Sequence, residues 1–327
     1  MDASETGKPL PRAFVSAPLP GEAVKRLQAI ADVVVGEVGE GVLGMAFADG
    51  ASQWEALVTL LTDRIDAELL ARAPRVRVVS NVAVGTDNID LEACRARGVV
   101  ITNTPGVLTE ATADLAFGLL LAAARRIAEG DRMIRTGDFV GWGPSLLVGK
   151  RVSGASLGIV GMGRIGQAMA RRARGFGMHL AYAQTRRLAP ELERALGATW
   201  LSVDELFASS DFVSLHCPLT PETHGLVSAA RLASMRKGSI LVNTARGGCV
   251  DEGALATVLE RGPLAAAGLD VFHDEPRVSP RLQALSNVVM TPHIGSADGP
   301  TRRAMADMAI EGAVAVLEGR EAPNRVA

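Results

Sequence analysis

The stretch GIVGMGRIGQAMARRARGFGMHLAYAQTRR, residues 158–187, has the order of a dinucleotide-binding unit. An apolar strand leads into the motif Gly161-Met162-Gly163-Arg164-Ile165-Gly166, a helical pattern follows, and a second apolar strand comes next. The first glycine of such a motif allows a tight turn, the second lets the backbone approach a pyrophosphate, and the third lets helix and strand pack closely. The phosphates then meet the free N–H groups of a helix N-terminus. We predict a dinucleotide site here; an ordinary tight strand–helix turn is the alternative.

The second strand of this unit ends in Gln184, Thr185, Arg186 and Arg187. An acidic residue usually stands at the position of Gln184, where it binds the ribose diol of NAD and would repel a 2′-phosphate. Here the acid is missing, Thr185 can donate a hydrogen bond, and either arginine can neutralise a phosphate. The four residues therefore predict that NADPH is preferred and that NADH use is possible. A solvated turn with relaxed specificity is the alternative, and the sequence does not say which arginine contacts the phosphate.

Composition narrows the class of protein. The chain has 327 residues, of which 48% are hydrophobic and 21% charged, and its formal net charge is −2. These values are typical of a globular protein and provide no basic field for nucleic acid or an anionic membrane. The three cysteines, Cys94, Cys217 and Cys249, have no metal-ligand spacing. Together with a polar first segment that lacks the order of a signal peptide, they predict a cytoplasmic protein.

Outside the dinucleotide unit, short apolar segments alternate with helical patterns. This alternation predicts an α/β fold with parallel sheets covered by helices. Because the dinucleotide unit begins only after about 155 residues, a separate α/β region precedes it and two domains are expected. The expected strands lie at 13–17, 55–62, 76–84, 99–104, 212–218, 239–245, 266–272 and 288–294, and the expected helices at 21–30, 109–126 and 300–317. The last helix is expected to return to the first domain, and residues 137–154 to form a glycine-rich loop.

Three residues stand where apolar strands end, which is where open parallel sheets bind their ligands. Arg246 ends SILVNTAR, Glu275 follows AAGLDVF, and His293 closes VVMTPH. A guanidinium can hold a carboxylate through two hydrogen bonds, and a carboxylate beside a histidine favours the protonated ring and fixes its tautomer. Together they supply what reduction of a 2-oxo acid needs. Taken singly, Arg246 can be a surface ion pair and Glu275 a solvated loop acid.

The remaining four histidines are weaker candidates. His179 lies inside a predicted strand and is interpreted as structural, and His224 as a solvated loop residue. His216 is a minor candidate for the proton donor. His273 is followed by Asp274 and Glu275, but adjacent residues of an extended strand point to opposite faces and chelate poorly. We therefore expect no metal site.

Six motifs in order resemble the D-isomer-specific 2-hydroxyacid dehydrogenase family. They are NVAVGTDNIDLEACRARGVVITNTPGVLTEATADLAFGLLLA, GIVGMGRIGQAMA, HCPLTPETHGLV, LVNTARGGCVDE, GLDVFHDEP and TPHIGSA. The resemblance extends from about residue 12 to residue 321. It implies two Rossmann-like domains, with a dinucleotide-binding domain at 105–294 inserted into a flavodoxin-like substrate domain at 1–104 and 295–327. It also implies a homodimer formed through the helix near Thr109, although that apolar helix can equally be buried within one chain.

The resemblance assigns roles to individual residues. It implies that Arg246, Glu275 and His293 are catalytic, and that Val84 and Gly85 bind the substrate carboxylate through backbone N–H groups. Asp270 is expected to contact the nicotinamide carboxamide, with Thr112 near the ring. The full set of expected cofactor contacts is Thr112, Gly161, Gly163, Arg164, Ile165, Gly166, Gln184, Thr185, Arg186, Arg187, Cys217, Pro218, Thr223, Thr244, Ala245, Asp270, His293 and Ser296.

Within the family, GDFVGWGPSLLVGKRVSG is similar to glyoxylate/hydroxypyruvate reductases. There a tryptophan of the neighbouring subunit reaches the substrate, so Trp142 is expected to act in this way, with simple interface packing as the alternative. Leu61, in VTLLTDRID, is expected to line the substrate site. The predicted function is reduction of glyoxylate and hydroxypyruvate by NADPH.

Other functions within this family stay open. A dehydrogenase for a bulkier D-2-hydroxy acid is the main alternative. Phosphoglycerate is disfavoured because only about thirty residues follow His293. Formate oxidation is disfavoured because Glu275 replaces the glutamine expected for that reaction, and phosphite oxidation is a minor possibility. A nucleotide-sensing corepressor scaffold is the remote alternative from another class, and kinetics would separate it from an enzyme.

Overall fold

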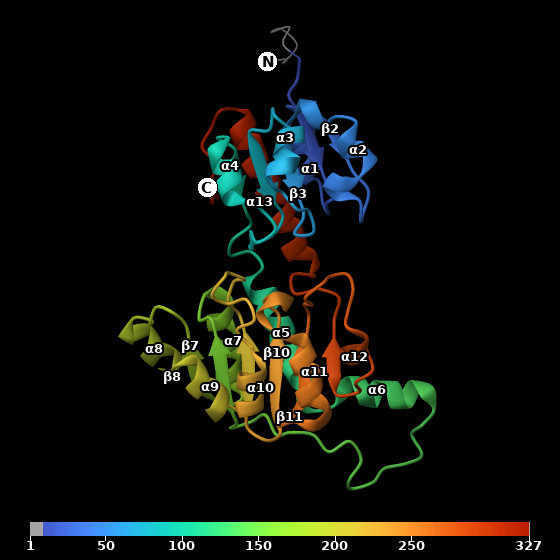
Figure 1. The fold of residues 1–327 in the computed structure, drawn as a ribbon, viewed down its shortest axis with the longest axis vertical. Coiled ribbons are helices and arrows are strands. Elements are labelled where there is room, and N and C mark those ends of the chain that lie inside the picture. The colour runs from blue at the N-terminus through green and yellow to red at the C-terminus, as the bar shows by residue number, and fades with distance from the viewer. Residues whose placement is uncertain (1–8, 327) are drawn as a thin grey trace. The chain divides into compact units, whose positions relative to one another are not determined.

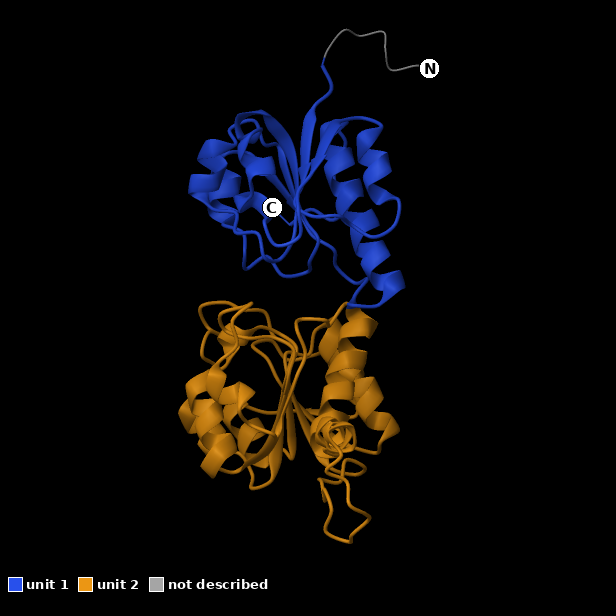
Figure 2. Cartoon of the chain, turned by 90° about the vertical axis from the view of Figure 1, so that its right-hand side faces the viewer, with its two compact units in different colours: residues 1–108, 297–327 blue, residues 109–296 orange. Residues whose placement is uncertain are grey.

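Two compact units make up the chain in the computed structural model, which describes residues 9–326 (Figures 1 and 2). Unit 1 contains the chain up to Leu108 and again from Ala297, and unit 2 contains Thr109–Ser296. The sequence predicts changeovers after residues 104 and 294, and the compact units change after residues 108 and 296. Each unit has one all-parallel sheet, so the predicted α/β class is confirmed.

Unit 1 has a five-stranded sheet in the order β2-β1-β3-β4-β5. Its strands are β1 (Arg12–Val15), β2 (Asp32–Val35), β3 (Trp54–Thr59), β4 (Val78–Asn81) and β5 (Val100–Thr102). Its helices are α1 (Ala23–Gln28), α2 (Met45–Ala48), α3 (Ala67–Arg72), α4 (Leu91–Ala96) and α13 (Gly299–Leu317), with short 3-10 turns at Gly41–Leu43 and Ala51–Gln53. The strands read as apolar runs because both faces of this sheet are covered.

The last helix, α13, packs on the sheet of unit 1, as expected from the sequence. Asp298 caps its first turn by accepting a hydrogen bond from the amide of Thr301. Gly312 faces the strands so closely that a Cβ would lie 2.5 Å from Oγ1 of Thr102. A side chain at this position would push the helix off the sheet, so the glycine is what permits close packing.

Unit 2 has a seven-stranded sheet in the order β12-β11-β10-β9-β6-β7-β8. Its strands are β6 (Ser156–Val160), β7 (His179–Ala183), β8 (Ala198–Trp200), β9 (Phe212–Leu215), β10 (Ser239–Asn243), β11 (Leu264–Leu269) and β12 (Val288–Met290). Its helices are α5 (Thr109–Ala124), α6 (Ile127–Thr136), α7 (Arg164–Gly175), α8 (Pro190–Leu196), α9 (Val203–Ser209), α10 (Ala229–Ser234), α11 (Glu252–Arg261) and α12 (Pro280–Gln283), with a 3-10 turn at Gly247–Cys249. The strand order reverses between β6 and β9, and ligands of doubly wound sheets bind beside such a switch point.

Both faces of the unit 2 sheet are buried. Alternate residues of β6 divide between two apolar clusters, with Leu157 and Ile159 on one face and Val160 on the other. Helix α5 covers the first face and buries Ala116, Leu120 and its neighbours there. The apolar sequence of α5 is therefore largely explained by packing within one chain, which the sequence had left open.

Within residues 9–326, no helix is long and apolar enough to cross a membrane.

Candidate active site

The glycine loop joins β6 to α7. Gly161 has φ +91°, and a Cβ there would lie 2.7 Å from the backbone of His216 and Cys217 at the end of β9. A Cβ on Gly166 would lie 2.1 Å from the carbonyl oxygen of Gly161. In contrast, nothing lies within 4 Å of a Cβ built on Gly163, the N-cap of α7. Two glycines therefore permit close packing, and the third leaves open space in front of a helix N-terminus.

Unpaired polar groups lie at the start of α7 and directly after strands β9 and β10. Within residues 9–326, the amides of Gly163, Arg164 and Ile165 donate to no protein acceptor, as expected for the first turn of a helix. Two buried side-chain atoms, Nδ1 of His216 and Oγ1 of Thr244, also have no partner in that part of the chain. Buried polar groups are rarely left unsatisfied. A dinucleotide with its phosphates at α7 would supply acceptors and donors, so these residues fit the predicted cofactor.

Gln184 connects the end of β7 to the glycine loop. Its Oε1 accepts a hydrogen bond of 2.9 Å from the amide of Met162, and its Nε2 donates to the carbonyl oxygen of Arg186. A carboxylate could accept the first bond but could not donate the second. The glutamine therefore both removes a negative charge from the cofactor side of β7 and holds the backbone of the following turn.

The two arginines after Gln184 have different surroundings. Arg187 forms two hydrogen bonds with Glu193, at 2.8 and 2.9 Å, and Arg187 together with Tyr182 lowers the pKa of Glu193 to about 2. Arg186 is exposed, and its side chain makes no hydrogen bond or ion pair with any residue in 9–326. The structure thus distinguishes an arginine engaged in an internal ion pair from one with a free guanidinium, which the sequence could not do.

His293 and Glu275 lie in contact at the carboxyl edge of the unit 2 sheet. Nδ1 of His293 is 2.8 Å from Oε2 of Glu275, and Oε1 of Glu275 accepts a hydrogen bond of 2.9 Å from the amide of Phe272. The side chains of His293 and Glu275 are 23% and 28% exposed. Within the described part of the chain, Nε2 of His293 has no partner. The pair therefore leaves one ring nitrogen free to exchange a proton with a ligand.

Opposing effects act on the carboxyl group of Glu275. Burial by itself raises its pKa, whereas hydrogen bonds from His293 and from the Phe272 amide, with the positive charges of His293 and Arg246, lower it. The net effect is a lowered pKa, so Glu275 is ionised at neutral pH. An ionised carboxylate accepts a hydrogen bond from Nδ1–H, so Nε2 of the neutral ring is bare. The carboxylate also favours the protonated ring, which carries a proton on Nε2 as well.

Arg246 is held through its backbone by the end of β10. The side chain of Asn243 donates to the carbonyl oxygen of Arg246 at 2.9 Å and accepts from the amide of Ala245 at 3.0 Å. Gly247 then passes so close to the β11 loop that a Cβ would lie 1.9 Å from the carbonyl carbon of Phe272. This approach brings the loop that carries Arg246 against the loop that carries Glu275. Asn243 is a supporting residue that sequence reasoning missed.

Asp270 holds the loop of His293 through several hydrogen bonds. Its Oδ1 accepts hydrogen bonds from Oγ1 of Thr291 and the amide of Ile294, at 2.6 and 2.8 Å, and its Oδ2 accepts from the amide of Gly295 at 2.8 Å. Its carbonyl oxygen accepts from the amide of His293 at 2.9 Å, and His293 has φ +53°. The sequence prediction gave Asp270 only a cofactor contact. The structure adds a role in fixing the backbone of His293.

Among the other predicted site residues of unit 2, Thr112 and Thr223 have defined neighbours, whereas Ser296 and Thr185 do not. Thr112 lies beside Asp270 and Gly295, since a Cβ on Gly295 would be 3.2 Å from Oδ2 of Asp270 and 3.4 Å from the methyl group of Thr112. At the end of β9, Oγ1 of Thr223 donates to the carbonyl oxygen of Pro218 at 2.6 Å, which closes the turn after Cys217. Among residues 9–326, no hydrogen-bond partner is found for the side chains of Ser296 and Thr185.

Two other histidines of unit 2, His216 and His273, differ from His293 in their surroundings. Burial lowers the pKa of His216 to about 4, and its Nε2 is 2.9 Å from Oγ of Ser214, so the ring is neutral near pH 7. His273 and Asp274 lie in a turn after β11 and not on an extended strand, which corrects the geometry expected from the sequence. Within residues 9–326, no three His, Cys, Asp or Glu side chains are arranged to hold a metal.

In unit 1, Leu61, Val84 and Gly85 follow neighbouring strands at the carboxyl edge of the sheet. Leu61 comes after β3, and Val84 and Gly85 come after β4. Within the described residues, the amides of Val84 and Gly85 donate no hydrogen bond to a protein acceptor. Successive free amides form a concavity suited to an anion.

Trp142 lies in a projecting segment of unit 2, residues 127–148, which we term the arm (Figure 1). Helix α6 of the arm buries no residue, and Trp142 is 84% exposed. The arm also exposes a series of apolar side chains: Ile127, Ile134, Phe139, Val140, Leu146 and Val148. Isolated exposed apolar residues are ordinary, but a continuous series marks a surface suited to a partner.

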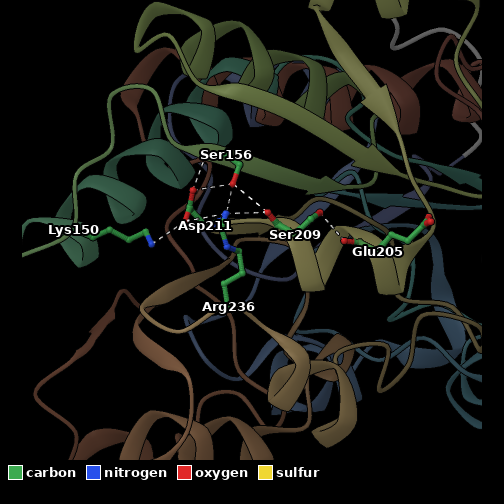
Figure 3. A network of polar contacts seen from close by, with 6 residues as sticks. All are labelled: Lys150, Ser156, Glu205, Ser209, Asp211 and Arg236. Carbon is green, nitrogen blue, oxygen red and sulfur yellow. Dashed lines mark hydrogen bonds and ion pairs between the residues drawn. The ribbon is translucent and has the colours of Figure 1, made fainter.

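The C-terminal end of the arm is fixed to the sheet of unit 2, and its start is held by a contact within α6. At its start, Arg126 forms two hydrogen bonds with Glu129, at 2.8 and 2.7 Å. Just after its end, Lys150 forms a 3.1 Å ion pair with Asp211, which also accepts from the amide and hydroxyl of Ser156 at 3.1 and 2.9 Å (Figure 3). Burial raises the pKa of Asp211, but the hydrogen bonds from Ser156 and Lys150 lower it by more. The net pKa is lowered, so the carboxylate is ionised. These contacts fix the point at which the arm returns to the sheet of unit 2.

Comparison with known proteins gives a consistent result. Residues 117–295 match the family D-isomer specific 2-hydroxyacid dehydrogenase, NAD binding domain. A glyoxylate reductase of Thermococcus litoralis is 44% identical over 320 residues, which cover 97% of this chain and 96% of that protein. A solved structure of a Thermus thermophilus protein is 48% identical, covers 97% of this chain and 100% of its own, and has a TM-score of 0.89.

A second solved structure has a described ligand. It is an NADPH-dependent glyoxylate/hydroxypyruvate reductase of Sinorhizobium meliloti in complex with NADP and malonate. It is 34% identical, covers 97% of each chain, and has a TM-score of 0.87.

Proposed function

Because the chain belongs to the D-isomer-specific 2-hydroxyacid dehydrogenase family, we propose that it reduces glyoxylate and hydroxypyruvate to 2-hydroxy acids and prefers NADPH. It is an NAD(P)-dependent reductase of 2-oxo acids. The observation that carries this function is the contact between Glu275 and His293, which leaves Nε2 of His293 without a partner in the described residues. The loop of Arg246 packs against the loop of Glu275. The contact supplies a proton donor where a family reductase needs one.

In the proposed mechanism, His293 and Arg246 act on one carbonyl group. The bound nicotinamide supplies a hydride to the carbonyl carbon. Arg246 binds the substrate carboxylate and polarises the carbonyl oxygen. His293 gives the proton on Nε2 to the oxygen as the alkoxide forms, and the negative charge of Glu275 stabilises the protonated ring beforehand. The products would be the 2-hydroxy acid, the oxidised nicotinamide cofactor and a neutral His293, which regains a proton from solvent.

Further residues are assigned to substrate and cofactor. We propose that the free amides of Val84 and Gly85 bind the carboxylate and that Leu61 contacts the rest of a small substrate. Asp270 and Thr112 are assigned to the nicotinamide carboxamide. Asp270 already accepts three hydrogen bonds, and two carboxylate oxygens have capacity for about four. One acceptor position is left for a cofactor amide.

The preference for NADPH is supported by the arrangement at the end of β7. Gln184 carries no charge that would repel a 2′-phosphate, and it orients the turn through the carbonyl oxygen of Arg186. The guanidinium of Arg186 is free, whereas that of Arg187 is bound by Glu193. We therefore assign the phosphate to Arg186, with Thr185 as a further donor.

A homodimer is proposed from the arm. Its exposed apolar residues and its fixed C-terminal end suit contact with a second copy, and the partly exposed side of α5 would extend the same surface. In such a dimer Trp142 would approach the substrate of the partner subunit. Sedimentation at micromolar concentration tests this proposal, because a monomer would contradict it.

Steady-state kinetics on a panel of 2-oxo acids with both cofactors tests the proposed function. We expect the highest kcat/KM for glyoxylate and hydroxypyruvate with NADPH, and at least about tenfold lower values with NADH. A higher kcat/KM for long-chain 2-oxo acids would favour a bulkier physiological substrate. Nucleotide binding without turnover of any 2-oxo acid would favour the corepressor scaffold.

A further inference from the structure

The loop after β4 has an unusual distribution of hydrogen bonds. Three consecutive carbonyl oxygens each face a donor: Ala83 accepts from the amide of Thr104 at 2.9 Å, Val84 from the side chain of Asn103 at 2.8 Å, and Gly85 from the side chain of Asn81 at 2.9 Å. Over the same residues, the amides of Val84 and Gly85 have no acceptor in the described part of the chain. Every carbonyl is held, and the amides are left available.

Peptide planarity converts this pattern into an orientation. The C=O of one residue and the N–H of the next lie in one rigid trans unit and point in opposite directions. A donor on the carbonyl of Val84 therefore directs the N–H of Gly85 away from that donor. In the same way, the Thr104 amide directs the N–H of Val84. Only the first of these two donors is a side chain, so Asn103 is the replaceable part of the arrangement.

Asn103 is held in turn by the C-terminal segment. Its amide donates to the carbonyl oxygen of Asn324 at 3.3 Å, and the side chain of Asn324 donates to the carbonyl oxygen of Asn103. Next to this pair, the amide of Val326 donates to the carbonyl oxygen of Ile101 at 2.7 Å. Arg325 forms an isolated antiparallel β-bridge with Thr102. Residues 324–326 thus extend the edge of the sheet beside β5 and fix the backbone from which the Asn103 side chain leaves.

We propose that Asn103 is a positioning residue that directs the Gly85 amide toward the substrate carboxylate, and that Asn324 of the C-terminal segment keeps Asn103 in place. This inference rests on the proposed function, in which Gly85 binds that carboxylate. A neutral amide suits the task because it donates at any working pH and adds no charge near the anion. An aspartate of the same shape would face the Val84 carbonyl with an acceptor.

The test compares Asn103→Asp with the unmodified enzyme. We expect KM for glyoxylate to rise about 2- to 10-fold, the range for one lost hydrogen bond, with little change in kcat or in the Kd for NADPH. Binding of oxalate, which has no reducible carbonyl, to the NADPH-loaded enzyme should weaken by a similar factor. Asn324→Ala, which keeps Asn103 itself, should give a smaller change in the same direction.

Asn287→Asp is the matched control. Its side chain also donates to two carbonyl oxygens, those of Leu259 and Ala265 at 3.2 and 3.0 Å, but it lies in unit 2 at the amino ends of the strands. It should leave KM for glyoxylate unchanged. An equal rise of KM in this control, or an unchanged KM and oxalate affinity in Asn103→Asp, would overturn the positioning role.

A separate measurement isolates the proposed role of Gly85. In the unmodified protein labelled with 15N-glycine, the Gly85 amide resonance should shift when oxalate is added. If it does not shift, the proposed carboxylate site is wrong. If it shifts while Asn103→Asp behaves as the unmodified enzyme, the carboxylate site stands and the role of Asn103 is wrong.

Discussion

The two sheets end in different chemistry at their carboxyl edges. In unit 2 the edge presents charged side chains, with Glu275 on His293 and an arginine on the neighbouring loop. In unit 1 the edge presents the backbone amides of Val84 and Gly85, whose peptide carbonyls accept hydrogen bonds from the Thr104 amide and the neutral Asn103 side chain. Proton transfer requires groups that titrate, whereas holding an anion does not. If the proposed function is right, the unit 2 edge performs chemistry that depends on pH, and the unit 1 edge binds the anion at any pH.

Replacement of His293 should have the largest effect at the charged edge, by which we mean the carboxyl edge of the unit 2 sheet with Glu275 and His293. His293→Ala should lower kcat by about 10²–10⁴-fold, the usual contribution of a general acid, because Nε2 is the proton donor. The Kd for NADPH should change far less. His179→Ala is the control, since that residue is exposed at the start of β7. Near-normal turnover of His293→Ala in a stopped-flow assay would mean that the charged edge does not perform the chemistry.

Separate replacement of the two arginines sharpens the comparison within unit 2. Arg186→Ala should reduce the ratio of kcat/KM for NADPH to that for NADH by roughly 10–150-fold, because it removes one charge-assisted hydrogen bond. The loss should lie in NADPH use, with NADH nearly unaffected. Arg187→Ala should change the ratio little, since that guanidinium is bound by Glu193. The reverse order of effects, measured with both cofactors, would assign the phosphate to Arg187.

Neutralising Glu275 tests whether the pH dependence comes from the charged edge. Reduction needs protonated His293, and the ionised carboxylate favours that form. Glu275→Gln should therefore move the alkaline limb of the kcat/KM profile to lower pH. The surface variant Glu260→Gln should leave the profile in place. If the alkaline limb does not move in Glu275→Gln, the 2.8 Å contact between Glu275 and His293 does not determine the pH dependence of reduction.

Trp142 tests whether the arm contributes to substrate binding in addition to the proposed residues of the two sheet edges. If the arm of one subunit contacts the substrate of another, Trp142→Ala should raise KM for hydroxypyruvate roughly 5-fold, as expected for about 1 kcal/mol of lost apolar contact. The Kd for NADPH should not change. Val140→Ala, in the same exposed segment, is the control. If Trp142→Ala and Val140→Ala give the same KM for hydroxypyruvate, Trp142 does not contact the substrate, and interface packing is the better interpretation.

Much of this molecule could be predicted from local sequence. The spacing of Gly161, Gly163 and Gly166 after an apolar strand indicated the turn at the switch point, because those constraints act within a few residues. Alternating apolar segments indicated parallel sheets, and polar residues after them indicated the ligand edge. Strand β2 and helix α6 were not predicted, because one is short and the other buries no residue.

Tertiary structure decided which of these residues engage one another. The sequence placed Arg186 and Arg187 side by side, and only folding brought Glu193 to the second and left the first free. Asn103 acquires its orientation from Asn324, which is 221 residues away. Sequence by itself determined the inventory of chemical groups and the local turns that expose them. Their partners depend on contacts between distant segments, and these exist only once the sheets have formed and the chain has returned.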